Sequence, residues 1–310
     1  MRKVLFALSL VLFVACSKQA PAGDVNEIPD EIKSITFTLT PFSIHEEGVQ
    51  TKTQIQNDGS FLWSPTDTLG VYPNVGSQVY FVASNGESAK SARFDGGGWG
   101  FRSGAEYNYY SYYPFIGDIY LDRTCIPVKY TGQKQVGTTS TSHVGNYDYM
   151  WSLGDKAEGE ISFSFHHLNC IIRLNATLPA GTYTKVAITA PSSVFAVLAH
   201  YDLTAVTPEI VADNQSNQIQ IDLENITVAD NSPFYIYIMS APVNVASQEI
   251  VISALNSSKK EYQCRKTPSY AFGAGMICGL RCDSWTEVPQ SMGLIIDDWG
   301  DGGSIGGNAD

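Results

Sequence analysis

Alternating apolar and polar positions run along most of the chain, and they predict β-strands. In residues 34–42, SITFTLTPF, the side chains of Ile35, Phe37 and Leu39 fall on one face, while serine and threonine fall on the other. Residues 217–228, NQIQIDLENITV, repeat this period of two with isoleucine and leucine against glutamine and aspartate. Because successive side chains of a strand point to opposite faces, each segment would bury one face and leave the other in water.

Two further segments are apolar on both faces, as strands that lie between two layers are. They are residues 233–243, PFYIYIMSAPV, and residues 248–256, QEIVISALN. Turn dipeptides such as Asn85-Gly86 separate runs of this kind, and the period of a helix is found nowhere after the first 16 residues. Regularly spaced strands with glycine-containing turns predict an all-β fold built of β-sandwiches.

Length and local composition predict how these strands divide. The chain has 310 residues, which is enough for two domains of ordinary size. Residues 152–160, SLGDKAEGE, are polar and contain glycine, and they separate an aromatic-rich half from the rest. We therefore expect an N-terminal sandwich over residues 34–158 and a C-terminal sandwich over residues 159–310. No short repeat is visible in the sequence, which argues against a propeller or a solenoid.

The first residues have the pattern of a bacterial lipoprotein signal. Two basic residues precede an apolar run over residues 4–14, which is shorter than the roughly 20 apolar residues that a membrane-spanning helix needs. A small residue is then followed directly by Cys16, the position that receives acyl chains in such signals. We expect residues 1–15 to be removed, Cys16 to be lipidated and residues 16–33 to form a flexible tether. The alternative is a plain signal peptide with an incidental cysteine.

Charge argues against one class of partner. The chain carries 19 lysine and arginine residues against 31 aspartate and glutamate residues, a net charge of −12. Such a chain has no electrostatic footprint for nucleic acid, and an anionic lipid surface would repel it. Attachment to a membrane therefore has to come from acyl chains on Cys16.

Several motifs, taken in order, resemble the fimbrillin-like lipoproteins of Bacteroidetes, the subunits of type V pili and their relatives. The lipid signal comes first, then the strand at residues 34–42 and a basic residue between threonines, Lys52 in QTKTQ. Residues 61–73, FLWSPTDTLGVYP, are similar to a segment of the family that joins an aromatic residue to Asp and to Gly-Val-Tyr. Within that segment the matching residues are Trp63, Asp67, Gly70, Val71 and Tyr72. The motifs that follow it are YYPF at 112–115, DYMW at 148–151, Phe165 and His167 in FSFHHLNCIIRLN, YAFGAGMICGLRC at 270–282 and the terminal I-x-x-W in LIIDDWGDGG.

The resemblance implies two tandem transthyretin-like β-sandwiches in a lipid-anchored pilus subunit of the outer membrane, which acts in fimbria assembly and cell adhesion. Its partners would be other pilin subunits, joined by exchange of a strand that fills a groove of the neighbour. In stalk subunits a protease opens the groove by cutting after an arginine. Here Lys52 takes that place, so the chain is either an uncut tip, anchor or accessory subunit, or is cut after Lys52 by another enzyme. The donor candidate is residues 291–299, SMGLIIDDW, which can equally be the last strand of their own sandwich.

Two short segments are candidates for metal chemistry, and their geometry disfavours both. In residues 162–170, SFSFHHLNC, the neighbours His166 and His167 would point to opposite faces of a strand, and Cys170 would lie roughly 13 Å along it from His166. We expect a hydrogen-bonded structural histidine instead. Residues 297–303, DDWGDGG, lack the ligand spacing of a calcium loop and favour a solvated tail. Since no nucleophile–base pair is readable either, the sequence predicts a protein without catalytic activity or cofactor.

Cysteines and tyrosines complete the candidate residues. Five cysteines follow Cys16, and this odd number leaves at least one thiol unpaired within an exported chain. Cys264 could form a disulfide with Cys278 or Cys282 across a hairpin. A group of tyrosines predicts either core packing or a platform for sugar rings, and the latter would make the chain a surface glycan-binding lipoprotein of a polysaccharide-uptake system. These are Tyr107, Tyr109, Tyr110, Tyr112 and Tyr113.

Overall fold

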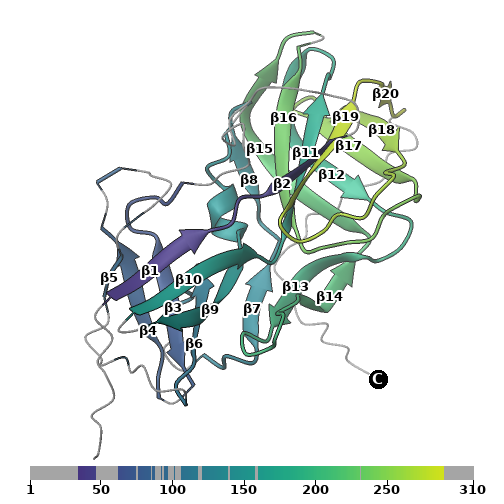
Figure 1. The fold of residues 1–310 in the computed structure, drawn as a ribbon. Helices are drawn as coiled ribbons and strands as arrows, with labels where there is room; N and C mark the ends of the chain where they lie inside the picture. The colour runs from purple at the N-terminus through teal and green to yellow at the C-terminus, as the bar shows by residue number, and fades with distance from the viewer. Residues whose placement is uncertain are drawn as a thin grey trace, which may run out of the picture.

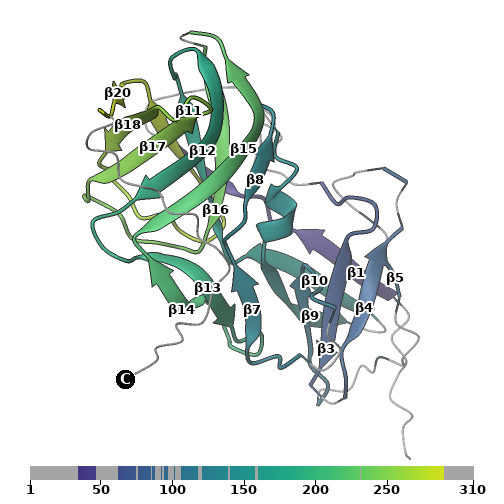
Figure 2. The same ribbon diagram turned by 180° about the vertical axis from the view of Figure 1, so that it is seen from behind.

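The computed structural model describes residues 34–46 and 62–289, except for residues 75, 85, 88–91, 93, 97–100, 102–105, 118–120, 139, 158–159 and 231. Within these residues twenty strands form four sheets, and the only helix is a 3₁₀ turn, η1 (Val144–Tyr147). The strands gather into two sandwich-like groups (Figures 1 and 2). The predicted all-β fold class is therefore confirmed.

The first group is a single seven-stranded sheet that curls back on itself. Its strands are antiparallel except for β1, which runs parallel to β10 at one end of the order. The ring centroid of Phe37 in β1 lies 5.0 Å from that of Phe94 in β5, so side chains from the two ends of the order meet in one aromatic core. In sheet order the strands are β1 (Ser34–Leu39), β10 (Glu160–His167), β9 (Met150–Ala157), β6 (Tyr109–Tyr113), β3 (Thr68–Pro73), β4 (Val79–Ala83) and β5 (Phe94–Gly96).

The second group is a sandwich of a four-stranded and a six-stranded sheet. The four-stranded sheet contains β16 (Phe234–Ser240), β11 (Cys170–Ala176), β19 (Met276–Cys282) and β2 (Ser43–Glu46), in that order. The six-stranded sheet contains β20 (Thr286–Glu287), β18 (Glu261–Lys266), β17 (Ile250–Asn256), β12 (Gly181–Thr189), β15 (Gln218–Val228) and β8 (Lys134–Val136). A third sheet of β14 (Val211–Ser216), β13 (Phe195–Tyr201) and β7 (Ile126–Lys129) lies below them (Figure 1).

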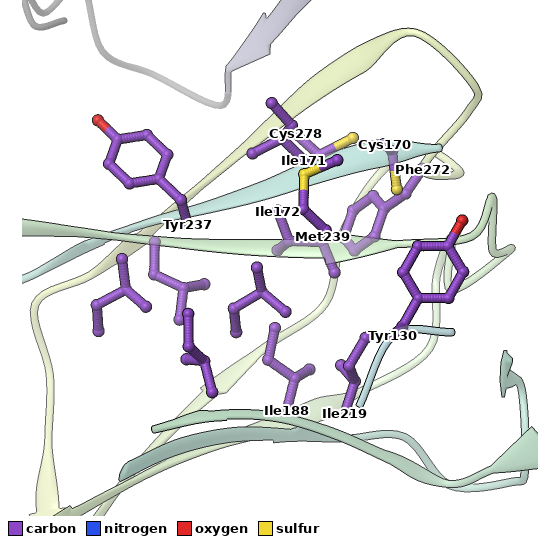
Figure 3. Close-up of a cluster of buried hydrophobic side chains, with 14 of the residues drawn as sticks. Tyr130, Cys170, Ile171, Ile172, Ile188, Ile219, Tyr237, Met239, Phe272 and Cys278 are labelled. Carbon is purple, nitrogen blue, oxygen red and sulfur yellow. The ribbon is translucent and has the colours of Figure 1, made fainter. Parts of the chain in front are cut away.

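The core of the second group confirms the predicted strand patterns. Figure 3 shows Ile188 and Ile219 of the six-stranded sheet pointing toward the layer that carries Ile172 and Met239. The alternating residues of β15 bury isoleucine and leucine, whereas β16 and β17 are largely buried along their length, as runs that are apolar on both faces should be. Each such side chain contributes about 1.5–3 kcal/mol when it leaves water, so this layer supplies much of the folding free energy.

Strand pairing corrects the predicted domain boundary. β10 lies beyond residue 158, yet it pairs with β9 and β1 in the seven-stranded sheet. β7 and β8 lie before that residue, yet they pair with β13 and β15 on the side of the second group. The boundary was placed on a polar segment that contains glycine, but a hairpin turn has the same composition as a linker. Residues 152–160 therefore join two strands of one sheet and do not separate two domains.

Candidate functional site

Residues 34–46 lie along the edge of both groups (Figure 1). β1 pairs in parallel with β10, from Ser34 opposite Glu160 to Leu39 opposite Phe165. Shortly afterwards β2 pairs in parallel with β19, where it is the last strand of the four-stranded sheet. One short segment therefore occupies the edge position of two sheets in two different groups.

Phe37 anchors β1 in the core of the first group. Its ring stacks on that of Phe163 at a centroid distance of 5.3 Å and an interplanar angle of 9°, and its centroid is 5.6 Å from that of Phe81. Ile35 and Leu39, on the same face, are half-buried. Aromatic pairs at such distances stabilise by more than their buried area alone, so this one ring provides a large part of the attachment of β1.

Between the two strands the backbone keeps its hydrogen bonds. The N–H of Thr40 donates to the carbonyl oxygen of Phe165 at 3.1 Å. The carbonyl oxygen of Thr40 lies 2.9 Å from Nε2 of His167. Two residues later the ring of Phe42 stacks on the same imidazole, with the ring centroids 3.6 Å apart. His167 thus contacts the segment twice at the point where it crosses from one group to the other.

A buried carboxylate holds His167 in place. Nδ1 of His167 lies 2.7 Å from Oδ1 of Asp148, and only 1% of each side chain is exposed. Asn169 donates to the same oxygen at 3.2 Å and accepts a hydrogen bond from the N–H of Tyr149 at 2.7 Å. Because the carbonyl oxygen of Thr40 can only accept, Nε2 of His167 carries a hydrogen. The contact with Asp148 requires a second proton, on the ring or on the carboxyl, so the pair as a whole is neutral.

The opposite edge of the four-stranded sheet, β16, is closed by side chains. Gln133 donates to the carbonyl oxygen of Met239 and accepts from its N–H, both at 2.7 Å. Gln135 donates to the carbonyl oxygen of Tyr235 at 2.8 Å and accepts from the N–H of Tyr237 at 3.0 Å. These two amides take the place of the peptide groups of a neighbouring strand. They therefore block β16 against pairing with another chain.

His143 completes the closure of β16. Its Nε2 lies 2.8 Å from the carbonyl oxygen of Tyr237, and because a carbonyl accepts, Nε2 carries the hydrogen. The buried Nδ1 has no hydrogen-bond partner among the described residues. Burial lowers the pKa of His143, and the bond to Tyr237 opposes this shift only in part. The imidazole is therefore neutral at pH 7, and protonation would place an unpaired charge in the core.

The predicted separation of His166 and His167 is confirmed. Burial alternates along β10, with His166 exposed and His167 buried, and His167 is hydrogen-bonded as expected. Cys170, however, does not continue the same strand, because the chain bends at residues 168–169 and Cys170 begins β11 in another sheet. In the part of the chain that the structure describes, no three His, Cys, Asp or Glu side chains are grouped so as to hold a metal ion.

The five cysteines that follow Cys16 are free thiols in the structure. The thiols of Cys264 and Cys282 are hydrogen-bonded to each other, and this bond lowers the pKa of Cys264 to about 7. Cys278 lies instead beside Cys170. Of the two partners predicted for Cys264, only Cys282 is thus placed next to it, on the other sheet of the sandwich. A disulfide between them stays a prediction.

The clustered tyrosines pack in the core. Tyr109, Tyr112 and Tyr113 are buried, whereas Tyr107 and Tyr110 are half-buried. The ring of Tyr112 covers Gly70, where an added Cβ would come within 2.0 Å of it, which explains why glycine precedes Val-Tyr in that segment. The suggestion that Tyr109 or Tyr112 forms a platform for sugar rings is therefore wrong, because the strand turns both of them inward.

Three predicted features lie outside the described residues. They are the lipidation site Cys16, the cleavage site Lys52 and the C-terminal segment that contains the donor candidate at residues 291–299 and the overlapping calcium-like DDWGDGG at residues 297–303. In the described part of the chain no helix has both the length and the apolar character to cross a membrane.

Sequence reasoning missed the residues that organise the two edges. Gln133 and Gln135 had a readable signal, since a Gln-x-Gln spacing places both amides on one face of a strand. Asp148 and Asn169 had no readable signal, because Asp148 lies 19 residues before His167 and the two come together only in the folded chain.

Comparisons with known proteins agree with this architecture. The sequence profile of fimbrillin-like proteins matches residues 51–299, which confirms the resemblance drawn from the ordered motifs. No curated protein sequence matches the chain. Among solved structures, a Bacteroides ovatus protein assigned to cell adhesion has a TM-score of 0.51 at 15% identity, over 83% of this chain and 96% of that one. At this identity the likeness shows a shared fold.

Two further solved structures are similar at lower scores. A Bacteroides uniformis protein assigned to cell adhesion has a TM-score of 0.49 at 14% identity, over 73% of this chain and 91% of its own. The tip fimbrial protein Mfa3 of Porphyromonas gingivalis, with a C-terminal truncation, has a TM-score of 0.38 at 11% identity, over 68% of this chain and 86% of its own.

Proposed function

We propose that this chain, which belongs to the fimbrillin-like family, is a lipid-anchored subunit of a cell-surface fimbria that acts in cell adhesion. In this proposal Cys16 carries the acyl chains that hold the uncut protein on the outer membrane, and a cut after Lys52 would release the subunit from this anchor. Its partners are other pilin subunits, and the role is structural, without catalysis. The relatives assigned to cell adhesion and to fimbriae support this proposal.

Subunits would join by strand exchange at the place that residues 34–46 now fill. The observation that carries this proposal is the double edge pairing of that segment, parallel to β10 in one sheet and to β19 in another. Lys52 lies between the end of β2 at Glu46 and the next described residue, Leu62. A cut after Lys52 would leave β1 and β2 held only by hydrogen bonds and ring contacts. A strand of another subunit could then replace them.

The two edges of the four-stranded sheet support this choice of site. At β16, two glutamines and His143 already occupy the backbone groups that a new strand would need. At β19, those groups are occupied by β2, which a cut would make replaceable. Donor-strand exchange in the second group is therefore assigned to the β19 edge, continuous with the β10 edge of the first group.

Electrophoresis of the processed chain tests this proposal. The chain is treated with a lysine-specific protease and run on unboiled denaturing gels, with Lys52→Gln as the matched uncut control. Strand exchange predicts a ladder of high-mass species that collapses on boiling, and no ladder from Lys52→Gln. Only monomer from a chain whose new N-terminus is Thr53 would count against polymerisation and leave an uncut tip, anchor or accessory role.

A further inference from the structure

Cys264 and Cys282 lie at a corner where the two sheets of the second group come together. Cys264 belongs to β18 in the six-stranded sheet, whereas Cys282 is the last residue of β19 in the four-stranded sheet. After β19 the chain crosses between the sheets within a few residues, because Thr286 of β20 already pairs with Gln263. Both cysteines are buried in the same hydrophobic core. The path of the backbone therefore brings them together from opposite sheets.

Cys264 is the more reactive thiol of this pair. The hydrogen bond from the thiol of Cys282 lowers the pKa of Cys264 to about 7, and the nearby Lys266 and the backbone N–H of Ser284 act in the same direction. The same hydrogen bond and burial raise the pKa of Cys282. At neutral pH the pair therefore offers a thiolate at Cys264 with a thiol beside it. Thiol–disulfide exchange requires such a thiolate to attack a disulfide and a second sulfur to complete the exchange.

A second pair of neighbouring thiols, Cys170 and Cys278, lacks both properties. β11 and β19 run parallel with Ile172 opposite Cys278, so Cys170 is displaced by two residues along its strand. The spacing and rise of strands place two such Cα atoms roughly 8 Å apart, whereas a disulfide spans Cα atoms no more than about 7 Å apart. The hydrogen bond with Cys278 and burial also raise the pKa of Cys170, so it stays protonated. Geometry and reactivity therefore select the first pair.

We propose that Cys264 and Cys282 form a disulfide in an oxidising compartment and that Cys170 and Cys278 remain thiols. The co-reactant is a disulfide-bearing oxidant, either a protein or a small molecule. The Cys264 thiolate attacks one sulfur of this oxidant and releases the other as a thiolate. The sulfur of Cys282, once deprotonated, attacks the Cys264 sulfur of the mixed disulfide and releases the second thiolate. The two cysteines lose two electrons and two protons, and the oxidant is reduced to two thiols.

The bond ties β19 to the opposite sheet, and it forms before the corner closes. In the folded chain only 2% of Cys264 is exposed, and Nε1 of Trp285 donates to the carbonyl oxygen of Cys282 at 2.8 Å. The oxidant therefore reaches Cys264 while β20 is still away from β18. Once formed, the disulfide holds the end of β19 against β18. β19 would keep this attachment if it lost β2 on its other side, and only this last consequence rests on the proposed strand exchange.

Peptide mass spectrometry of the uncut chain tests the pairing. The reduced chain is folded from urea in a mixture of reduced and oxidised glutathione, its remaining thiols are blocked with N-ethylmaleimide in urea, and it is digested with trypsin without reduction. Cleavage after lysine and arginine leaves each of the five cysteines after Cys16 in a peptide of its own. We expect residues 261–265 to be joined to the peptide that begins at Cys282, and Cys170 and Cys278 to carry the blocking group.

Three other results would overturn the proposal. A link from Cys264 to Cys278 would show that the wrong partner was chosen. A link between Cys170 and Cys278 would contradict the exclusion by strand geometry. Blocked thiols at both Cys264 and Cys282 would show that the disulfide does not form. Because the chain is uncut in this experiment, none of these results bears on strand exchange.

The attachment of β19 is tested by thermal unfolding of the same uncut chain with and without a reductant. Closing a loop as long as residues 264–282 should raise the unfolding midpoint by about 5–10 °C, and reduction should remove this shift. Cys264→Ala cannot form the bond, so the reductant should leave its midpoint unchanged, and Cys282→Ala serves the same purpose if the first variant does not fold. Cys278→Ala is the matched control, because it loses a buried thiol but keeps the disulfide. A linked chain whose midpoint does not fall on reduction, or an equal fall in Cys264→Ala, would overturn the stabilising role.

Discussion

Removal of the Phe37 ring is the sharpest perturbation of the exchangeable segment in the uncut chain. The side chain is buried and contacts the rings of Phe163, Phe81 and Phe94 at centroid distances of 5.3, 5.6 and 5.0 Å. Replacing a buried phenylalanine by alanine costs about 3–5 kcal/mol, and three aromatic contacts favour the upper part of this range. If β1 opens separately from the rest of the sheet, the free energy needed to open it falls by the same amount.

Amide hydrogen exchange measures that attachment. A loss of about 3–5 kcal/mol corresponds to an increase of about 10²- to 10³-fold or more in the exchange rate of the β1 amides. Thr36→Ala is the matched control, since Thr36 is exposed on the same strand and its replacement should cost no more than about 0.5 kcal/mol. Less than tenfold faster exchange in Phe37→Ala would refute the view that this ring holds β1. Equal acceleration of every core strand would refute separate opening.

Three further outcomes test the rest of the structure. Gln135→Met leaves two backbone groups of β16 without their partners, so we expect a loss of about 2–5 kcal/mol in urea unfolding, and a loss below 1 kcal/mol would contradict the closure of this edge. His143 has a folded-state pKa below its unfolded value, so the unfolded state binds the proton first and stability falls as the pH drops below about 6.5. Unfolding of His143→Gln should depend less on pH over that window, and an identical dependence would contradict a buried neutral imidazole. Among the five cysteines that the structure describes, a thiol reagent should label the exposed Cys125 in the native reduced protein and reach the four buried ones only after unfolding. Rapid native labelling of Cys264 would contradict its burial.

Local patterns predicted the strands because burial in a sheet follows the period of the backbone. Phe37 and its alternating neighbours could be placed on one face of β1 from the sequence alone, and so could the opposed directions of His166 and His167. The domain boundary could not be placed, because the turn between β9 and β10 has the composition of a linker. Only the pairing of β10 with β9 and β1 shows that this segment is a hairpin turn and not a linker between domains.

The site depended on contacts that sequence spacing does not encode. Thr40 and His167 are 127 residues apart, yet their hydrogen bond marks the crossing between the two groups. Gln135 reaches Tyr235 across 100 residues, and its role as a substitute strand follows only from β16 being an edge. The tyrosine cluster was ambiguous because alternation states that some rings are buried but does not identify which ones. The structure shows that both faces of this strand are buried, since Tyr109 and Tyr113 face one hydrophobic core and Tyr112 faces the other.

The central claim is that residues 34–46 hold a place that a strand of another subunit takes. Intact-mass analysis of the polymers formed after cleavage at Lys52 tests it most directly, because it reads whether that segment is still bound. We predict that each internal subunit of the polymer has lost residues up to Lys52 and that the released segment is recovered in equal number. Polymers in which every subunit retains residues 34–46 would contradict strand exchange at this groove.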